Sequence, residues 1–229
     1  MLTALFVGLV ASSTLVIGAL AGAFFEPPRR LVAVALAFAS GALITSLAFE
    51  LFEEAFRTGG PWFAGGGLLA GAAAFIVADR LLERHTSDSS GFALLAGVTL
   101  DGVPENTALG VSLIGSSLSG ILALLVSIFA SNLPEALGGA VGMRAANRSR
   151  RFIIVTWTAT GALLAAAVVV GNAAFSGVGG ETLTVVRAFA GGAVPASLAD
   201  TLMPEAYKEG GAYVAFATAV GFLLSFLLS

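Results

Sequence analysis

Long apolar segments, separated by short clusters of Gly, Pro and charged residues, make up most of the chain. A helix needs about 20 mostly apolar residues to span a bilayer, and windows of about 19 residues locate such stretches. This pattern predicts eight membrane-spanning helices, at 3–25, 30–52, 61–82, 91–113, 118–143, 152–175, 182–204 and 212–228. The loop signals between them include the Gly-Gly-Pro sequence that ends at Pro61. Because every connection is short, neighbouring helices are expected to run antiparallel.

The composition favours the same all-α, polytopic membrane fold. Hydrophobic residues make up 57% of the 229 positions and charged residues only 11%. Eight spans use about 160 residues, so we expect one transmembrane domain over residues 1–229. The chain has no cysteine, which excludes disulfides and thiolate ligands. Its few scattered basic residues argue against nucleic acid as a partner.

The basic residues predict the orientation in the membrane. Lys and Arg number nine in the odd-numbered connections and two, Arg57 and Arg187, in the even-numbered ones. Since basic loops stay in the cytoplasm, both termini are expected outside it, in a multi-pass protein of the plasma (cytoplasmic) membrane. No basic residue precedes Arg29, so the first apolar stretch is expected to be a retained span and not a cleaved signal peptide.

Two internal repeats predict a symmetric architecture. Residues 38–60 and 189–211 align without a gap at an offset of 151 and share 12 of 23 positions, including Ser46 with Ser197 and Glu54 with Glu205. In the predicted topology, their helices run in opposite directions. Residues 101–110 and 131–140, at an offset of 30, share a Pro-Glu dipeptide. The expected arrangement is 3+2+3, with a first three-helix unit at 1–86, a central pair at 91–146 and an inverted unit at 152–229, which is typical of secondary transporters.

Acidic residues lie deep inside the central pair of helices, where ionisable groups are costly and mark functional sites. Asp101 and Glu105 are four residues apart, so their side chains share one helix face. Ser131 and Glu135 repeat this spacing on the next helix, with Asn132 alongside. We predict that these five residues form a metal site.

The same segments contain Pro104 and Pro134, which cannot donate hydrogen bonds to the carbonyls of Leu100 and Ala130. Those oxygens are then available to a cation at bilayer depth. Neither predicted span contains Lys, Arg or His to neutralise the carboxylates, which repel one another. A divalent metal, exchanged against protons, is the simplest partner. The alternative is a set of protonated acids that hydrogen-bond to neighbouring helices.

These motifs resemble a known family. The segments Asp101-Gly102-Val103-Pro104-Glu105 and Ser131-Asn132-Leu133-Pro134-Glu135 are similar to the paired metal-binding helices of the ZIP (Zrt- and Irt-like) family of divalent metal transporters. Residues 50–55 and 203–206 resemble that family's second and seventh helices, so the resemblance covers essentially the whole chain. It implies uptake of a divalent metal into the cytoplasm without a prosthetic group, and it allows a homodimer contact through the flanking helices.

The ligand set departs from the family pattern. The fourth-helix motif usually begins with His-Asn and here reads Asp101-Gly102, and the fifth usually begins with His or Gln and an acid and here reads Ser131-Asn132. Oxygen ligands alone shift the preference from zinc, the family default, toward manganese, magnesium, calcium or ferrous iron. The family often has a histidine-rich cytoplasmic loop, but the single His85 favours a plain solvated loop here.

Two other functions are weighed against transport. An intramembrane aspartyl protease is disfavoured because Asp101 and Asp200 lack its sequence signatures, so no enzyme activity is expected. A non-transporting membrane scaffold or metal sensor on the same fold is the alternative, since the ligand set is altered. A further set of acids is expected at the mouths of the pathway, with interfacial solvation as the other interpretation: Glu50, Glu53 and Glu54 outside, and Asp200 and Glu205 inside.

Overall fold

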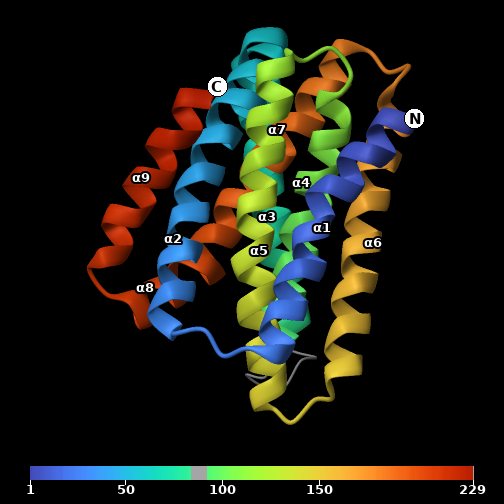
Figure 1. Cartoon of the computed structure of the whole chain (residues 1–229). Helices are drawn as coiled ribbons and strands as arrows, with labels where there is room; N and C mark the ends of the chain where they lie inside the picture. Colours follow the sequence, from blue (N-terminus) through green and yellow to red (C-terminus); the bar gives the residue numbers. More distant parts are fainter. Residues whose placement is uncertain (84–91, 229) are drawn as a thin grey trace.

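The structure, a computed structural model, describes residues 1–83 and 92–228, and these form a bundle of helices (Figure 1). The helices are α1 (Leu2–Phe24), α2 (Arg29–Ser46), α3 (Glu54–Glu83), α4 (Phe92–Ser112), α5 (Leu118–Ala145), α6 (Arg150–Phe175), α7 (Gly180–Ser197), α8 (Met203–Gly210) and α9 (Tyr213–Leu228). Two π-helical segments, η1 (Leu47–Glu53) and η2 (Leu198–Leu202), join α2 to α3 and α7 to α8. The all-α expectation is confirmed, and the predicted loop around His85 lies outside the described residues.

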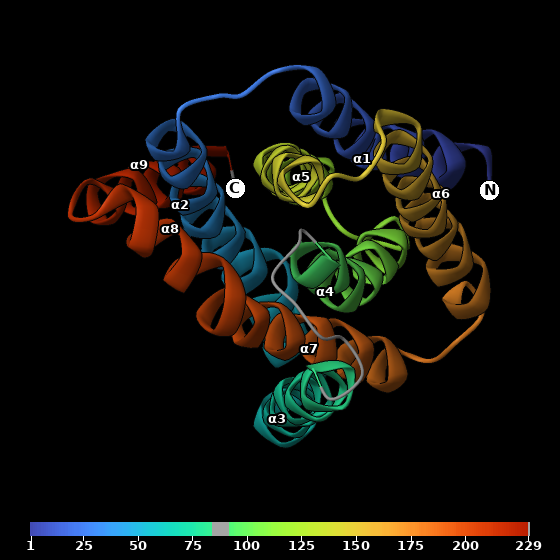
Figure 2. The same ribbon diagram turned by 90° about the horizontal axis from the view of Figure 1, so that it is seen from below.

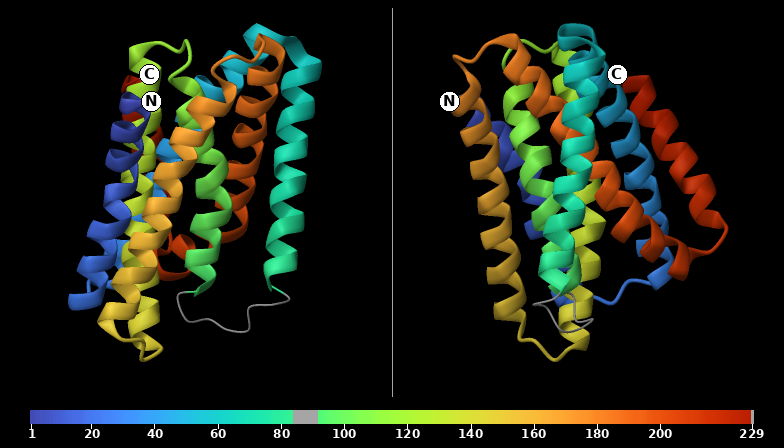
Figure 3. Two further views of the ribbon diagram at one scale, coloured as in Figure 1. Left: turned by 90° about the vertical axis from the view of Figure 1, so that its right-hand side faces the viewer. Right: turned by 180° about the vertical axis from the view of Figure 1, so that it is seen from behind.

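The prediction of eight separate helices is wrong in number, because the described residues form seven helical runs, each without an intervening loop. The difference lies at the Gly-Gly-Pro sequence, where a loop is expected. The chain stays helical on both sides of Gly60, whose φ of 74° and ψ of 179° interrupt the helix at one residue. Glycine adopts a positive φ without steric cost, so this single residue is enough to turn the chain back on itself (Figure 3).

The helices are compatible with a membrane-embedded protein. Five runs within the described residues are long and apolar enough to cross a bilayer: Leu2–Phe24, Arg29–Leu81, Leu118–Ala145, Arg150–Phe175 and Gly180–Gly210. Large apolar side chains such as Leu69 and Phe216 are exposed on the outside of the bundle, as lipid contact requires. Helix α4 lies in the interior, between other helices (Figure 2), so its polar residues need not face lipid.

Local sequence explains where several helices begin and end. The hydroxyls of Ser117 and Ser149 accept hydrogen bonds from the backbone N–H of Gly120 (3.1 Å) and Phe152 (3.2 Å) and thereby cap α5 and α6. Helix α1 ends before an extended Phe25, and two prolines that cannot continue it follow. The connections are short, and both termini lie at the same end of the bundle (Figure 1).

The helices pack as two groups. Helices α1, α4, α5 and α6 share one apolar core, which includes Leu15, Met143 and Trp157. In the other group, α3 packs along α7, while α9 and α8 pack along α2. The two groups meet where α2 packs on α5 and α7 packs on α4. The expected three-helix unit at 1–86 is therefore divided between the groups, since α1 packs with α5 and α6.

The two related segments adopt the same local structure. Helices α2 and α7 each have 18 residues and end at Ser46 and Ser197. Each is followed by a π-helical segment. The two repeated segments, 38–60 and 189–211, each end at a glycine with positive φ, Gly60 at 74° and Gly211 at 61°. The offset of 151 relates all these positions. The two helices run in opposite directions (Figure 3).

Glycines set how closely the second group packs. A Cβ at Gly192 in α7 would overlap the carbonyl oxygen of Leu68 in α3, and a Cβ at Gly41 in α2 would overlap that of Thr218 in α9. Gly41 and Gly192 are related by the same offset. Each helix that follows a positive-φ glycine therefore docks on the first helix of the other segment, as small residues allow at membrane helix interfaces.

Candidate metal site

The predicted site residues lie on α4 and α5, which pack against each other, α4 in the interior of the bundle and α5 with one face exposed (Figure 2). All five are buried: the exposed fraction is 7% for Asp101, 3% for Glu105 and Glu135, and 1% for Ser131 and Asn132. Charged groups in a membrane interior are costly and are rarely left without a role. The burial of these residues therefore indicates a functional site.

The three carboxyl groups lie in one region and interact electrostatically. Asp101 lies near enough to Glu105 and Glu135 for these groups, when ionised, to repel one another, and the same holds for Glu105 and Glu135. Burial removes the water that would weaken these interactions. The structure therefore brings the acids of α4 and α5 together, and a cation between them would relieve their repulsion.

Two carboxylates differ in their hydrogen bonds. An oxygen of Asp101, Oδ2, accepts a hydrogen bond of 2.7 Å from Ser197 Oγ at the end of α7. In Glu105, the buried Oε1 has no hydrogen-bond partner among the described residues. A buried polar atom without a partner is uncommon in native structures. Glu105 Oε1 therefore offers a lone pair to a ligand.

The other two predicted residues are engaged in helix packing. Ser131 Oγ donates to the carbonyl of Ile128 in the same helix (3.1 Å). Asn132 Nδ2 donates to the carbonyl of Ala11 in α1 (3.2 Å). Neither of these two hydrogen bonds reaches the three acids. Ser131 and Asn132 thus hold α5 in place in this arrangement.

The described residues contain no group of three or more acidic, histidine or cysteine side chains that is arranged to hold a metal ion as it stands. The acids are near enough to repel one another but do not converge on one point. Binding of a shared cation would therefore need a shift of side chains or of the two helices, and carboxylate repulsion is one physical reason for their separation.

Two further polar residues belong to this region and were not predicted as site residues. Ser197 contacts Asp101, and its place in the repeat beside Ser46 is a sequence signal that could have identified it. Asn106 is fully buried next to Glu105. Its Nδ2 donates to the carbonyl of Gly102 (2.8 Å), while its Oδ1 has no partner among the described residues. A polar residue directly after the Pro-Glu dipeptide was the available signal.

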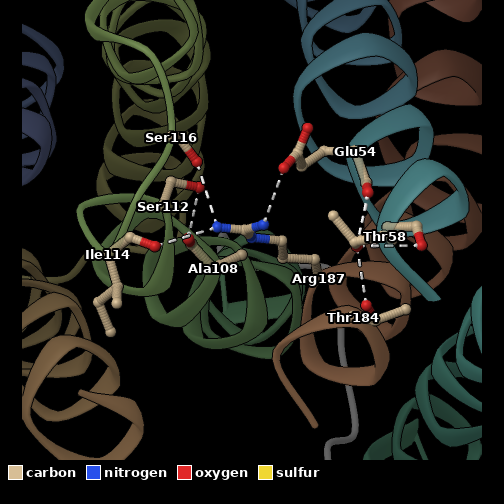
Figure 4. A network of polar contacts seen from close by, with 9 residues as sticks. Glu54, Thr58, Ala108, Ser112, Ile114, Ser116, Thr184 and Arg187 are labelled. Atoms are coloured by element: carbon tan, nitrogen blue, oxygen red, sulfur yellow. Dashed lines mark hydrogen bonds and ion pairs between the residues drawn. The ribbon is translucent and has the colours of Figure 1, made fainter. Parts of the chain in front are cut away.

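Arg187, expected in an even-numbered connection, does not lie in a connection. It lies inside α7 with only 5% of its side chain exposed, and its Nη1 is 3.5 Å from Glu54 Oε1 (Figure 4). Its Nη2 donates to Ser116 Oγ (3.2 Å) and to the carbonyl of Ile114 (3.5 Å), both after the end of α4. Glu54, expected at the outer mouth, is therefore part of a polar network.

A cavity of about 470 Å³ lies at the other end of the bundle, between the start of α2, the end of α5 and α8. Glu205, expected at the inner mouth, lines it. Its lining also includes Gly138, which is three residues, about one helical turn, after Glu135 in α5. The cavity thus extends from the end of the bundle to within one turn of the acidic region.

Comparison of the chain with models of known protein families gives no match, and no curated protein matches it.

Proposed function

We propose that the chain is a secondary transporter that moves a divalent metal cation into the cytoplasm through the carboxylates of Asp101, Glu105 and Glu135. The observation that carries the proposal is the burial of these three neighbouring acids, which would repel one another when ionised, on two packed helices. A divalent cation compensates both the charge and the lost hydration, which neutral packing residues cannot do. Alternating access at a site between related helix groups is the usual transport mechanism for such architectures.

The cavity supports a pathway on one side of this site. It opens at the end of the bundle that is expected in the cytoplasm and ends near Gly138, below Glu135. A metal leaving the acids would enter it and pass Glu205, whose carboxylate is suited to attract a cation.

The proposed metals follow from the ligand chemistry. Carboxylates and an amide oxygen favour manganese, ferrous iron, magnesium or calcium, while the resemblance to the ZIP family makes zinc the default. Neither histidine nor cysteine occurs in α4 or α5, and the thioether of Met143 in α5 is packed in the apolar core. We therefore infer a preference for manganese or iron that competes with zinc.

The proposed topology has both termini outside the cytoplasm. The basic residues Arg144, Arg148, Arg150 and Arg151 flank the connection from α5 to α6, opposite the termini, which supports this orientation in the plasma membrane (Figure 1). With the reversal at Gly60, the chain would make eight crossings in a 3+2+3 order of inverted repeats. A homodimer through the flanking helices is compatible with this topology.

A metal sensor or scaffold is the alternative, and one observation favours it: the acids do not converge into a ready three-ligand site. A sensor would bind metal without moving it. Transport and sensing therefore differ in flux and not in affinity.

The test is metal uptake into proteoliposomes, with zinc, manganese, iron, cadmium, magnesium and calcium offered one at a time. We expect saturable uptake of at least one metal by the wild type, with losses of at least about tenfold in Asp101→Asn and Glu135→Gln, because each removes a negative ligand. Ser131→Ala is the matched control, since its hydroxyl bonds only within α5. Equal flux in all four proteins would remove the assignment of these acids, and metal binding without flux would establish the sensor.

A further inference from the structure

The polar network around Arg187 joins the two groups of helices at the end of the bundle where both termini lie (Figures 1 and 4). Arg187 and Glu54 belong to the second group, through α7 and α3. The oxygens that accept from the guanidinium, Ser116 Oγ and the carbonyl of Ile114, belong to the turn between α4 and α5. We call these four residues the latch.

A second contact reinforces the latch. Glu50 in η1 places its Oε2 against the first turn of α5, where a Cβ on Gly120 would overlap it. Thr58 Oγ1 and Thr184 Oγ1, 2.9 Å apart, bind α3 to α7 beside the ion pair (Figure 4). The second group thus holds the turn between α4 and α5 at two points.

The two repeats give every position of this network a counterpart at the opposite end. The offset of 151 relates Arg187 to Leu36, Glu54 to Glu205, Thr58 to Glu209 and Thr184 to Ala33. Continued beyond the aligned residues, the offset of 30 between the central helices relates Ser116 to Ala146 and Ile114 to Arg144. Five of these six counterparts line the cavity, and Arg144 is not among them: Ala33, Leu36, Ala146, Glu205 and Glu209.

The cavity therefore occupies the place that mirrors the latch. The two ends differ at most of these positions, and only Glu54 and Glu205 are the same residue. At the position of Arg187, whose guanidinium reaches across to the central helices, the cavity end has Leu36. An ion pair does lie beside the cavity, between Arg29 Nη1 and Glu209 Oε1 (3.6 Å). It joins α2 to α8 within the second group, so it does not hold α5. A second ion pair at this end, between Arg144 in α5 and Glu26, joins α5 to the connection between α1 and α2 and not to α7 or α8.

We propose that the latch closes the end of the bundle that bears the termini, and that Leu36, in place of a second arginine, leaves the opposite end open. This inference rests on the proposed transport, because it assigns the two ends of one pathway to different states. Arg187 is buried, and its Nε has no partner among the described residues. A buried ion pair adds little net stability over an apolar contact of similar volume, so the latch can separate when its charged groups reach water or another partner. Release of Arg187 from the turn would free the α4 to α5 connection to move away from α7.

Cysteine accessibility tests the latch directly, since the chain has no cysteine of its own. Two reporters are related by the offset of 30: Val111→Cys, fully buried in the last turn of α4, and Val141→Cys, which lines the cavity. The protein is placed in lipid nanodiscs without added metal, so that both ends are accessible, and the rate of reaction with a charged maleimide is measured.

With the latch intact, Val141→Cys should react at least about tenfold faster than Val111→Cys, because a closed end admits the reagent only from a minor state. Arg187→Leu copies the residue of the open end and should raise the rate at Val111→Cys by about tenfold. Arg187→Lys keeps the charge and should raise it less. Leu36→Arg supplies a cation opposite Glu205 and should slow the reaction at Val141→Cys.

Equal rates at the two reporters in the wild type would overturn the proposal, as would an unchanged rate at Val111→Cys in a folded, monodisperse Arg187→Leu protein. Should Arg187→Leu not fold, an unchanged rate at Val141→Cys in Leu36→Arg would overturn it instead. These rates are measured without metal flux. A latch that opens as expected in a protein that transports nothing would therefore reject the proposed function and retain the latch.

Discussion

At the scale of single residues, the buried oxygen atoms of α4 carry most of the chemistry. Glu105 Oε1 and Asn106 Oδ1 have no partner among the described residues, while Asp101 is held by Ser197. Unpartnered oxygens are suited to an incoming cation, and a partnered carboxylate is already oriented for one. The site thus combines free ligands with one ligand positioned from the other helix group.

Ser197→Ala tests this positioning. Loss of the 2.7 Å hydrogen bond to Asp101 should weaken the affinity for manganese by about tenfold, because residues that orient a metal ligand commonly matter to this extent. The matched control is Ser46→Ala at the related position, where the hydroxyl bonds only to carbonyls of its own helix. Titration calorimetry in detergent compares them. Equal affinities in the two variants would show that Ser197 does not position a ligand.

Asp101→His tests the role of the ligand set in metal choice. An imidazole favours zinc over harder ions, so the ratio of zinc to manganese uptake should rise by about tenfold relative to the wild type. Asp101→Asn is the control, because it removes the negative charge, adds no imidazole nitrogen and keeps an oxygen that can coordinate a metal. A ratio that stays constant in Asp101→His would place the discriminating ligands elsewhere in the chain.

The sequence was enough to single out the acids of the proposed site and to predict that they lie in apolar helices, but not to predict their contacts. Asp101, Glu105 and Glu135 are recognisable because carboxylates in apolar helices have few neutral explanations. Ser197 and Arg187 depend on which helix lies beside α4, and helical periodicity does not specify packing partners. For the same reason, the hydrogen bond of Asn132 to α1 could not be anticipated.

At the scale of the elements, the repeated unit is an 18-residue helix, a π-helical segment and a glycine with positive φ. The predicted order of apolar segments agrees with the structure except where Gly60 replaces a loop. A Gly-Gly-Pro sequence is normally a loop signal, but a single glycine can reverse a helix when the next helix docks at once on a neighbour. That docking depends on tertiary contact, here between α3 and α7.

Gly192→Ala tests the docking of α3 on α7. The new Cβ would overlap the carbonyl oxygen of Leu68, so the helices must separate, at a cost of about 1–3 kcal/mol. Gly66→Ala is the control, because nothing lies near a Cβ at that position. There, alanine should be neutral or stabilise by up to about 1 kcal/mol. Thermal unfolding in detergent measures both, and similar midpoints would contradict the close approach.

At the scale of the whole molecule, the two helix groups differ in what they contribute. The group of α1, α4, α5 and α6 carries the acids, and the other group supplies Ser197 and Arg187, which contact the first group near the site and at one end. The repeats make the two ends alike in shape, while single substitutions such as Leu36 for arginine make them chemically different. The composition of the chain predicts the membrane environment, but it does not predict the chemical difference between the two ends of the bundle.

The most direct measurement is the anomalous diffraction of manganese in crystals of the protein soaked with the ion. We predict one strong peak between α4 and α5, with oxygens of Asp101, Glu105 and Glu135 drawn to within about 2.0–2.6 Å of it. A manganese peak that only other residues coordinate would contradict a shared carboxylate site. The absence of any peak at a manganese concentration that supports uptake would also contradict it.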